Sequence, residues 1–232
     1  MNIFFLDADS VKSAAFMLDK HIVKMPLESA QMLSTTHRLL DCVPMKTSKK
    51  TFWLLPGEKL VPDGEKFTIE DRKCFQVAHA KHPSTVWTML TKSNYLHHLE
   101  ILKAMLAEYT LRYGKIHSVE KILPLLGNAP TNIPDGVITS KPLAKPDIYK
   151  TEDVVESYRR YYAGEKWRFA KWKNKEIPDW FPVYMSKVWG DSEYLNRLKQ
   201  VCSLGAKKTK PMNKNILVIA RELCHEHSDK VV

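Results

Sequence analysis

The sequence predicts a mainly α-helical fold: a single multi-helix domain with a short N-terminal strand and a small insertion resembling a β-hairpin. Two observations lead to this prediction. Several long stretches repeat apolar residues at helical spacing, whereas β-forming residues beside turn signals are confined to the first residues and to residues 44–75. A length of 232 residues and a hydrophobic content of 44% are sufficient for one ordinary core.

The N-terminal elements follow from local signals. "NIFFL" is a short apolar run that predicts a buried strand, and Asp9 or Ser10 is placed to cap the next helix. That helix is expected over residues 11–40. Because Pro26 lies within it, either the helix kinks there or a second helix begins with Pro26 in its first turn. Residues 44–75 mix β-forming residues with turn signals and predict the hairpin-like insertion.

The clearest helix is expected over residues 84–113. Its apolar residues recur at steps of three and four, and Gly114 is a natural stop. "HSVEKILPLLG" predicts a shorter helix, and residues 127–148, which contain four prolines, predict an extended loop. A loop of that length inside a compact protein is often functional.

The remaining helices are expected over residues 151–175, near 192–204 and near 213–224, with the basic connector "GAKKTKPMNKN" between the last two. No internal repeat is visible. The predicted organisation has two parts, a helical catalytic-like domain over residues 1–182 that carries the 44–75 insertion, and a C-terminal helical extension over residues 183–232.

One predicted helix carries polar side chains where a core seam would normally run. In "DKHIVKMPLESAQ" these residues are His21, Lys24, Glu28 and Gln31, at steps of three, four and three. Three interpretations are open for Lys24. Packed between His21 and Glu28, Lys24 would be one of three things: an amine nucleophile with a pKa lowered by burial, an ammonium that binds phosphate, or part of a polar network that holds helices together.

The charge balance favours a polyanionic partner. The chain has 36 Lys+Arg against 26 Asp+Glu, a net charge of +10. Residues 158–175 hold seven of these cations, interleaved with six aromatic residues, and predict either a nucleic-acid-binding face or a solvated helix face. Glu165 falls on the aromatic stripe there, so a raised pKa would make it an acid or base, and a nearby cation would make it a structural ion pair.

Further cations and polar residues lie near predicted helix ends. Lys81 and His82 precede a helix N-terminus, which suits a phosphate, and Lys115 follows a helix end. Glu108 and Arg112 are spaced for a surface salt bridge. The residues expected to contact nucleic acid are Arg38, Lys81, His82, Asn94, Arg112, Lys115, Arg159, Arg160, Lys166 and Lys173.

No metal or other cofactor is expected. The four cysteines form no C-x-x-C pair and are interpreted as reduced thiols. Cys74 with His79 and His82 lacks a structural-zinc spacing, as does the "CHEH" stretch near the end of the chain. Asp7 and Asp9 would suit Mg²⁺ at a strand end, but Asp9 is favoured as a helix cap.

Five stretches together resemble a family of phage and bacterial proteins labelled pyrimidine-dimer DNA glycosylase. They are "MNIFFLDAD", "DKHIVKMPLESAQMLSTTHR", "KHPSTVWTMLTKSNY", "EYTLRYGKIH" and "KPDIYKTEDVVESYRRYYAGEKWRFAKWK". The resemblance covers most of residues 1–182. It implies an N-terminal α-amine nucleophile working with a glutamate. Here Asn2 is too large for efficient removal of Met1, so a side-chain amine such as that of Lys24 would have to replace it.

The sequence therefore predicts an enzyme that acts on a pyrimidine base of double-stranded DNA, flips the base out, and excises it as a glycosylase/lyase or modifies it. The polar stripe would be the reactive centre, and residues 158–175 the DNA-facing helix. A non-catalytic nucleic-acid-binding or inhibitory phage protein and a nucleotide-acting transferase or hydrolase remain alternatives. Because no membrane span or signal peptide is recognised, a cytoplasmic location is expected, in the host cell if a phage encodes the chain.

Overall fold

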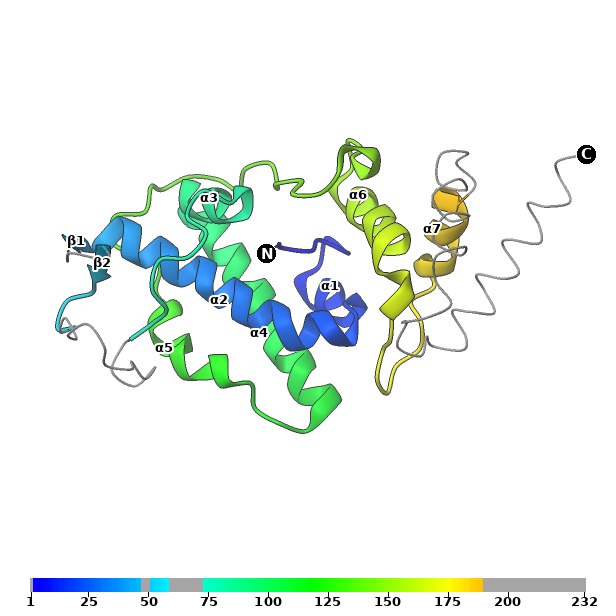
Figure 1. Ribbon diagram of the computed structural model, residues 1–232, viewed down its shortest axis with the longest axis horizontal. Coiled ribbons are helices and arrows are strands. Elements are labelled where there is room, and N and C mark those ends of the chain that lie inside the picture. The colour runs from blue at the N-terminus through cyan, green and yellow to red at the C-terminus, as the bar shows by residue number, and fades with distance from the viewer. Residues whose placement is uncertain (1, 47–50, 59–72, 190–232) are drawn as a thin grey trace, which may run out of the picture.

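The computed structural model describes residues 2–46, 51–58 and 73–189, and these form a mainly helical structure with one two-stranded antiparallel sheet (Figure 1). The predicted helical class and the hairpin-like insertion are confirmed. The elements in chain order are α1 (Ser10–Phe16), α2 (Asp19–Asp41), β1 (Val43–Lys46), β2 (Thr51–Leu54), α3 (Pro83–Leu90), α4 (Lys92–Tyr113), the 3₁₀ turn η1 (Ser118–Ile122), α5 (Leu123–Leu126), the 3₁₀ turn η2 (Asp147–Tyr149), α6 (Val154–Tyr161), the π-helical turn η3 (Tyr162–Lys166), the 3₁₀ turn η4 (Trp167–Phe169) and α7 (Trp180–Trp189).

The first residues are buried, but they form no strand. Residues 3–6 are at most 4% exposed, as the apolar run predicts. Their backbone groups bond to a side chain of α1: the Leu6 amide donates to Ser13 Oγ, and Ser13 Oγ donates to the Phe4 carbonyl, both at 3.0 Å. The predicted N-terminal strand is wrong because a helix side chain takes the place of a neighbouring strand.

The helix expected over residues 11–40 is broken, but not at Pro26. Met17 and Leu18 are extended, and α2 begins directly after them, where the Asp19 amide donates to the Lys171 carbonyl at 2.9 Å. Pro26 lies inside α2, where it only removes the N–H that would bond to the carbonyl four residues earlier. The break therefore depends on a contact with a distant segment rather than on the proline.

The helix expected over residues 84–113 is also two helices. Thr91 is extended, its Oγ1 accepts the Asn94 amide at 3.1 Å, and the Lys92 amide donates to the Pro134 carbonyl at 2.8 Å. The apolar stripe of α4 and its end at Gly114, which adopts a left-handed conformation with φ of 64°, are as predicted.

The helix expected over residues 151–175 ends early. After α6 the chain forms η3 and η4, and no helix continues beyond Phe169. Tyr162, Ala163 and Gly164 are buried in succession in the π-helical turn.

Helix α7 is not predicted by the sequence analysis. Its side chains Phe181, Met185 and Trp189 are buried in the same core as α6, and the predicted boundary after residue 182 falls inside this helix. The helices predicted near 192–204 and 213–224 lie outside the described residues.

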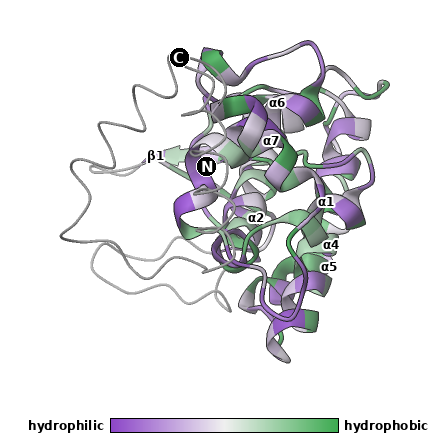
Figure 2. Cartoon of the chain, turned by 90° about the vertical axis from the view of Figure 1, so that its right-hand side faces the viewer, coloured by the Kyte–Doolittle hydropathy of each residue, from purple (hydrophilic) through white to green (hydrophobic). Residues whose placement is uncertain are grey.

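Two groups of helices surround the core. Helix α2 packs on α3 and α4, and α1 packs on α4, whereas α6 and α7 pack on each other and on η3 (Figure 1). The N-terminal segment lies between the groups, where Phe4 contacts Tyr158 and Phe5 contacts Trp87. The longer helices carry both hydrophilic and hydrophobic residues (Figure 2). No α-helix within the described ranges is long and apolar enough to cross a membrane.

Candidate functional site

His21, the first residue of the polar stripe, contacts the second group of helices. Its Nδ1 forms a hydrogen bond with the hydroxyl of Tyr162, and its ring stacks on Phe4 with 4.6 Å between centroids. Burial, reinforced by the positive charges of Lys166, Lys24 and Lys20, lowers the pKa of His21 to about 3. Burial also raises the pKa of Tyr162. The pair is therefore neutral at pH 7.

Lys24 does not have the environment expected of it. Its side chain is 68% exposed, and its Nζ lies 2.9 Å from Oε1 of Glu28, a buried carboxylate. The prediction of a desolvated Lys24 amine is wrong, because the Lys24 side chain reaches solvent although His21 and Glu28 on either side of it are buried. Gln31 is half-buried, and its carbonyl accepts a hydrogen bond from Thr35.

Glu165 is exposed, so the prediction that it is desolvated on an aromatic stripe is wrong as well. It lies in the π-helical turn, where the wider turn moves it off the face that Tyr162 occupies. Its Oε1 accepts a hydrogen bond of 2.9 Å from the hydroxyl of Tyr149, whose ring packs on Tyr161 with centroids 5.4 Å apart. Glu165 is thus a solvent-facing carboxylate held in a fixed orientation.

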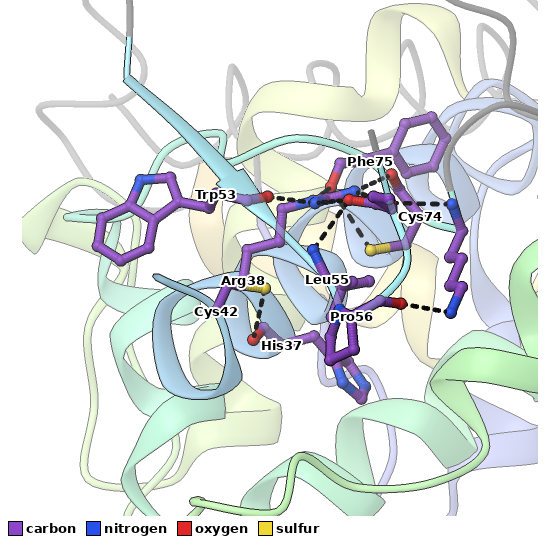
Figure 3. A network of polar contacts seen from close by, with 10 residues as sticks. His37, Arg38, Cys42, Trp53, Leu55, Pro56, Cys74 and Phe75 are labelled. Carbon is purple, nitrogen blue, oxygen red and sulfur yellow. Dashed lines mark hydrogen bonds and ion pairs between the residues drawn. The ribbon is translucent and has the colours of Figure 1, made fainter. Parts of the chain in front are cut away.

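Arg38, expected to contact nucleic acid, is fully buried (Figure 3). Its two terminal nitrogens bind both carboxylate oxygens of Glu58 at 2.6 and 2.8 Å. It also donates to the carbonyls of Trp53, Cys74 and Phe75, so it joins α2 to the insertion. Burial alone would raise the pKa of Glu58, but hydrogen bonds from Arg38 and two backbone amides outweigh it and lower that pKa.

Asn94 and Arg112 are buried too. The side-chain nitrogen of Asn94 donates to the Trp87 carbonyl at 2.8 Å and to Thr139 Oγ1 at 2.7 Å. The side-chain oxygen of Asn94 accepts a hydrogen bond of 2.9 Å from the backbone amide of Thr139. Arg112 is 2% exposed and binds Glu108 and Asp19 within α4 and α2. Because their polar groups are used inside the fold, we no longer expect Arg38, Asn94 or Arg112 to contact nucleic acid.

Two more of the predicted contacts are partly engaged. Arg159 is half-buried, donates to the Leu6 carbonyl at 2.8 Å, and lies 5.1 Å from the centre of the Trp180 ring. Arg160 is half-buried and lies 3.9 Å from Glu156. Arg159 is thus tied to the N-terminal segment, whereas Arg160 pairs within its own helix, α6.

The other predicted contacts lie at the surface or at a helix end. Lys81 and Lys115 are exposed. His82 caps α3, because its Nδ1 accepts the Ser84 amide at 3.2 Å. Lys166 and Lys173 belong to the surface described next.

Three lysines near the first turn of α2 lie over aromatic rings: Lys20 belongs to that turn, Lys166 lies close to His21, and the Lys173 amide donates to the Asp19 carboxylate at 2.8 Å. Lys20 is 4.2 Å from the centre of the Phe169 ring, Lys166 is 4.5 Å from that of Tyr161, and Lys173 is 5.1 Å from that of Tyr113. We call these three pairs the cation–aromatic surface. Arg159, Lys166 and Lys173 are spaced seven residues apart but do not share one helix face, because the helix changes to a π-helical turn and ends before Lys173.

Lys145, in the loop of residues 127–148, is not among the site residues predicted from the sequence. Its Nζ lies 3.6 Å from the centre of the Tyr158 ring, is shielded from solvent, and has no hydrogen-bond partner among the described residues. Burial and the nearby charge of Lys150 lower the pKa of Lys145 to about 7. The sequence pointed to this lysine only through the long predicted loop that contains it, because no spacing distinguishes Lys145 from its neighbours.

No group of three or more His, Cys, Asp or Glu side chains in the described part of the chain is placed to hold a metal ion. Asp9 caps α1 by accepting the Lys12 amide at 2.8 Å, which confirms the favoured interpretation. Cys42 and Cys74 are free thiols, and burial raises the pKa of Cys42 to about 11. Cys202 and Cys224 lie outside the described residues.

No family model matches the chain, and comparisons with curated proteins and with solved structures find no match either. The resemblance to pyrimidine-dimer glycosylases therefore stays a prediction.

Proposed function

We propose that this protein is a DNA-acting enzyme that works on a pyrimidine base, which it excises or modifies. The observation that carries the proposal is the cation–aromatic surface, in which Lys20, Lys166 and Lys173 lie over aromatic rings near the first turn of α2, the turn that also holds His21 of the neutral His21–Tyr162 pair.

This surface has the two components that bind an unstacked nucleotide. Lysine amines neutralise phosphates, and aromatic rings offer faces on which a base stacks, a contact worth about 1–3 kcal/mol per base. Tyr161 and Phe169 are half-buried rather than sealed in the core. At an exposed site the attraction between a cation and an aromatic ring is worth about 0.5–1 kcal/mol. This attraction holds each lysine near its ring, so the lysine side chains lose less conformational freedom when DNA binds.

A carboxylate for proton transfer lies next to this surface. Glu165 directly precedes Lys166, is exposed, and is oriented by the Tyr149 hydroxyl. Base excision requires a group that gives or accepts a proton as the base leaves, and an oriented carboxylate is suited to that role. Glu165 therefore keeps its proposed catalytic role, although as an exposed rather than a desolvated group.

Replacing Lys166 or Lys173 by alanine is expected to weaken binding to duplex DNA by a similar factor for every sequence tested. Each change should also reduce the slope of log Kd against log salt by about 1, because one phosphate contact is lost. Fluorescence anisotropy with labelled DNA between 50 and 200 mM salt measures both effects. Lys103→Ala, an exposed lysine of α4 outside the cation–aromatic surface, is the matched control and should change neither quantity. Equal losses in all three variants would contradict the proposal.

Catalysis is tested by incubating the protein with ultraviolet-irradiated or hydroxymethylpyrimidine DNA and measuring released base or altered nucleosides. A Glu165→Gln variant should bind these DNAs normally and form at least 10-fold less product, as expected for loss of a proton-transfer group. Salt-sensitive binding without any product would favour a non-catalytic nucleic-acid-binding protein. Thermal stabilisation by free nucleotides with little affinity for DNA would favour a nucleotide-acting enzyme.

A further inference from the structure

Lys145 lies in a short stretch of loop that is fixed from two sides. The Ala144 carbonyl accepts a hydrogen bond of 2.9 Å from the side-chain amide of Asn2. The Tyr158 hydroxyl lies 2.8 Å from the Pro142 carbonyl and 3.0 Å from Oδ1 of Asn2. These bonds hold the backbone before Lys145 and the ring of Tyr158 in one arrangement, with the amine over the ring face.

The amine of Lys145 differs in kind from that of Lys24. It is shielded from water and has no hydrogen-bond acceptor among the described residues, so the charged form is poorly solvated. With its pKa near 7, about half of the molecules carry a neutral amine at neutral pH. A lysine with an ordinary pKa is neutral in fewer than about one molecule in 1,000 at that pH.

Contact with the Tyr158 ring stabilises the charged form of the Lys145 amine more than the neutral form. The ring attracts the ammonium, by about 0.5–2 kcal/mol, but has no comparable attraction for the neutral amine. Deprotonation therefore frees the amine to turn away from the ring by rotation of its own flexible side chain. Lys145 is half-buried, so part of that side chain already reaches solvent.

The cluster around Tyr158 continues into the proposed catalytic surface. Phe4 meets Tyr158 edge-to-face and stacks with Tyr161 and His21, with centroid separations of 5.9, 6.4 and 4.6 Å. Tyr161 in turn contacts Lys166 and the ring of Tyr149. Lys145 thus belongs to one continuous aromatic cluster with the residues proposed to bind DNA.

We propose that the side-chain amine of Lys145 is the nucleophile of this enzyme and attacks C1′ of the target deoxynucleotide, an inference that rests on the proposed function. The nitrogen lone pair forms the N–C1′ bond while the bond from C1′ to the base breaks. The base leaves with that electron pair and takes up a proton, and the attacking nitrogen loses one. The nitrogen lone pair then forms a double bond to C1′ as the C1′–O4′ bond breaks and O4′ takes a proton. The resulting iminium needs no oxidant or reductant to form.

Borohydride trapping tests this assignment. The full chain is incubated with borohydride and either irradiated DNA or DNA that contains an abasic site, and the adduct is located by peptide mass spectrometry. We expect the adduct on Lys145, with a yield that rises with pH around a midpoint near 7. Lys145→Arg should trap at least 10-fold less, whereas Lys141→Arg, in the same loop, should trap normally. Mapping the adduct of the unaltered chain keeps the test decisive if Lys145→Arg does not fold.

The outcomes separate this inference from the proposed function. Base release with an adduct on another residue, or with undiminished trapping by Lys145→Arg, overturns the role of Lys145 and leaves the proposed function standing. Absence of base release from every DNA overturns excision, and glycolaldehyde with cyanoborohydride then probes the amine alone. Labelling of Lys145 at least 10-fold faster than Lys141 supports its nucleophilic character, and equal rates overturn it.

Discussion

Replacing Arg38 by methionine is expected to lower the free energy of unfolding by about 3–5 kcal/mol, the cost of leaving one member of a buried ion pair alone. The Glu58 side chain is 2% exposed and would keep its charge without the guanidinium that binds both of its oxygens. The carbonyls of Cys74 and Phe75 would lose their donor at the same time.

Urea denaturation at neutral pH measures this loss. The double variant Arg38→Met/Glu58→Gln is the matched control, because it removes the buried charge together with its partner and should recover part of the loss. Arg38→Lys should not restore full stability, because an ammonium cannot bind both carboxylate oxygens and three carbonyls in the planar geometry of a guanidinium. A loss below about 1 kcal/mol for Arg38→Met would show that the pair behaves like an exposed salt bridge.

Arg38 also illustrates what single-sequence reasoning cannot predict. An arginine near the end of a predicted helix is interpreted as a surface cation because long charged side chains are seldom fully buried. Its partner Glu58 comes from the insertion, 20 residues further on, and the other contacts come from Cys74 and Phe75. No local spacing brings these residues together, so the burial of Arg38 is visible only in the folded chain.

The helix breaks have the same origin. The apolar stripe of α4 and the left-handed stop at Gly114 depend on neighbouring residues only, and the sequence predicts both. The breaks before Asp19 and at Thr91 involve backbone hydrogen bonds to Lys171 and Pro134, each more than 40 residues away. Periodicity continues through such breaks, so it predicts one helix where the tertiary contacts make two.

For the candidate site, the sequence predicted which segments lie together, but it did not predict the environment of each side chain. The polar stripe and the aromatic-rich segment of residues 158–175 do meet, at the contact between His21 and Tyr162. Which amine is desolvated could not be predicted, because desolvation depends on the packing of the 127–148 loop on Tyr158 rather than on any pattern within α2. The nucleophile we propose is therefore Lys145 rather than Lys24.

Lowering the pH from 7.5 to 5 is expected to lower the free energy of unfolding by about 4 kcal/mol through two buried histidines, His21 and His98. Burial lowers the pKa of each to about 3, with the charge of His97 contributing at His98. In the unfolded chain both have pKa values near 6.5 and bind a proton as the pH falls, whereas in the folded chain both stay neutral down to about pH 3. The stabilisation that the two neutral histidines contribute is therefore present above pH 6.5 and is lost below it, by about 2 kcal/mol per histidine at pH 5.

The contacts of His98 explain why protonation is resisted there. Thr88 Oγ1 donates its hydrogen to the Ser84 carbonyl at 2.8 Å, so the bond of 2.8 Å between Thr88 and His98 requires Nδ1 of His98 to be the donor. A second proton would have to go on Nε2, which is buried and has no hydrogen-bond partner among the described residues. The cationic ring would thus be both desolvated and unpaired.

Urea denaturation of the unaltered chain, His98→Leu and His21→Phe at the two pH values isolates these contributions from those of carboxylates. Each variant changes the stability at pH 7.5 for reasons of packing, so the informative quantity is its loss of stability between pH 7.5 and 5. That loss should be about 2 kcal/mol smaller than in the unaltered chain for each variant, because one titrating histidine has been removed. If a variant loses as much stability as the unaltered chain, the replaced histidine is protonated in the folded protein at pH 5 and its burial does not exclude charge.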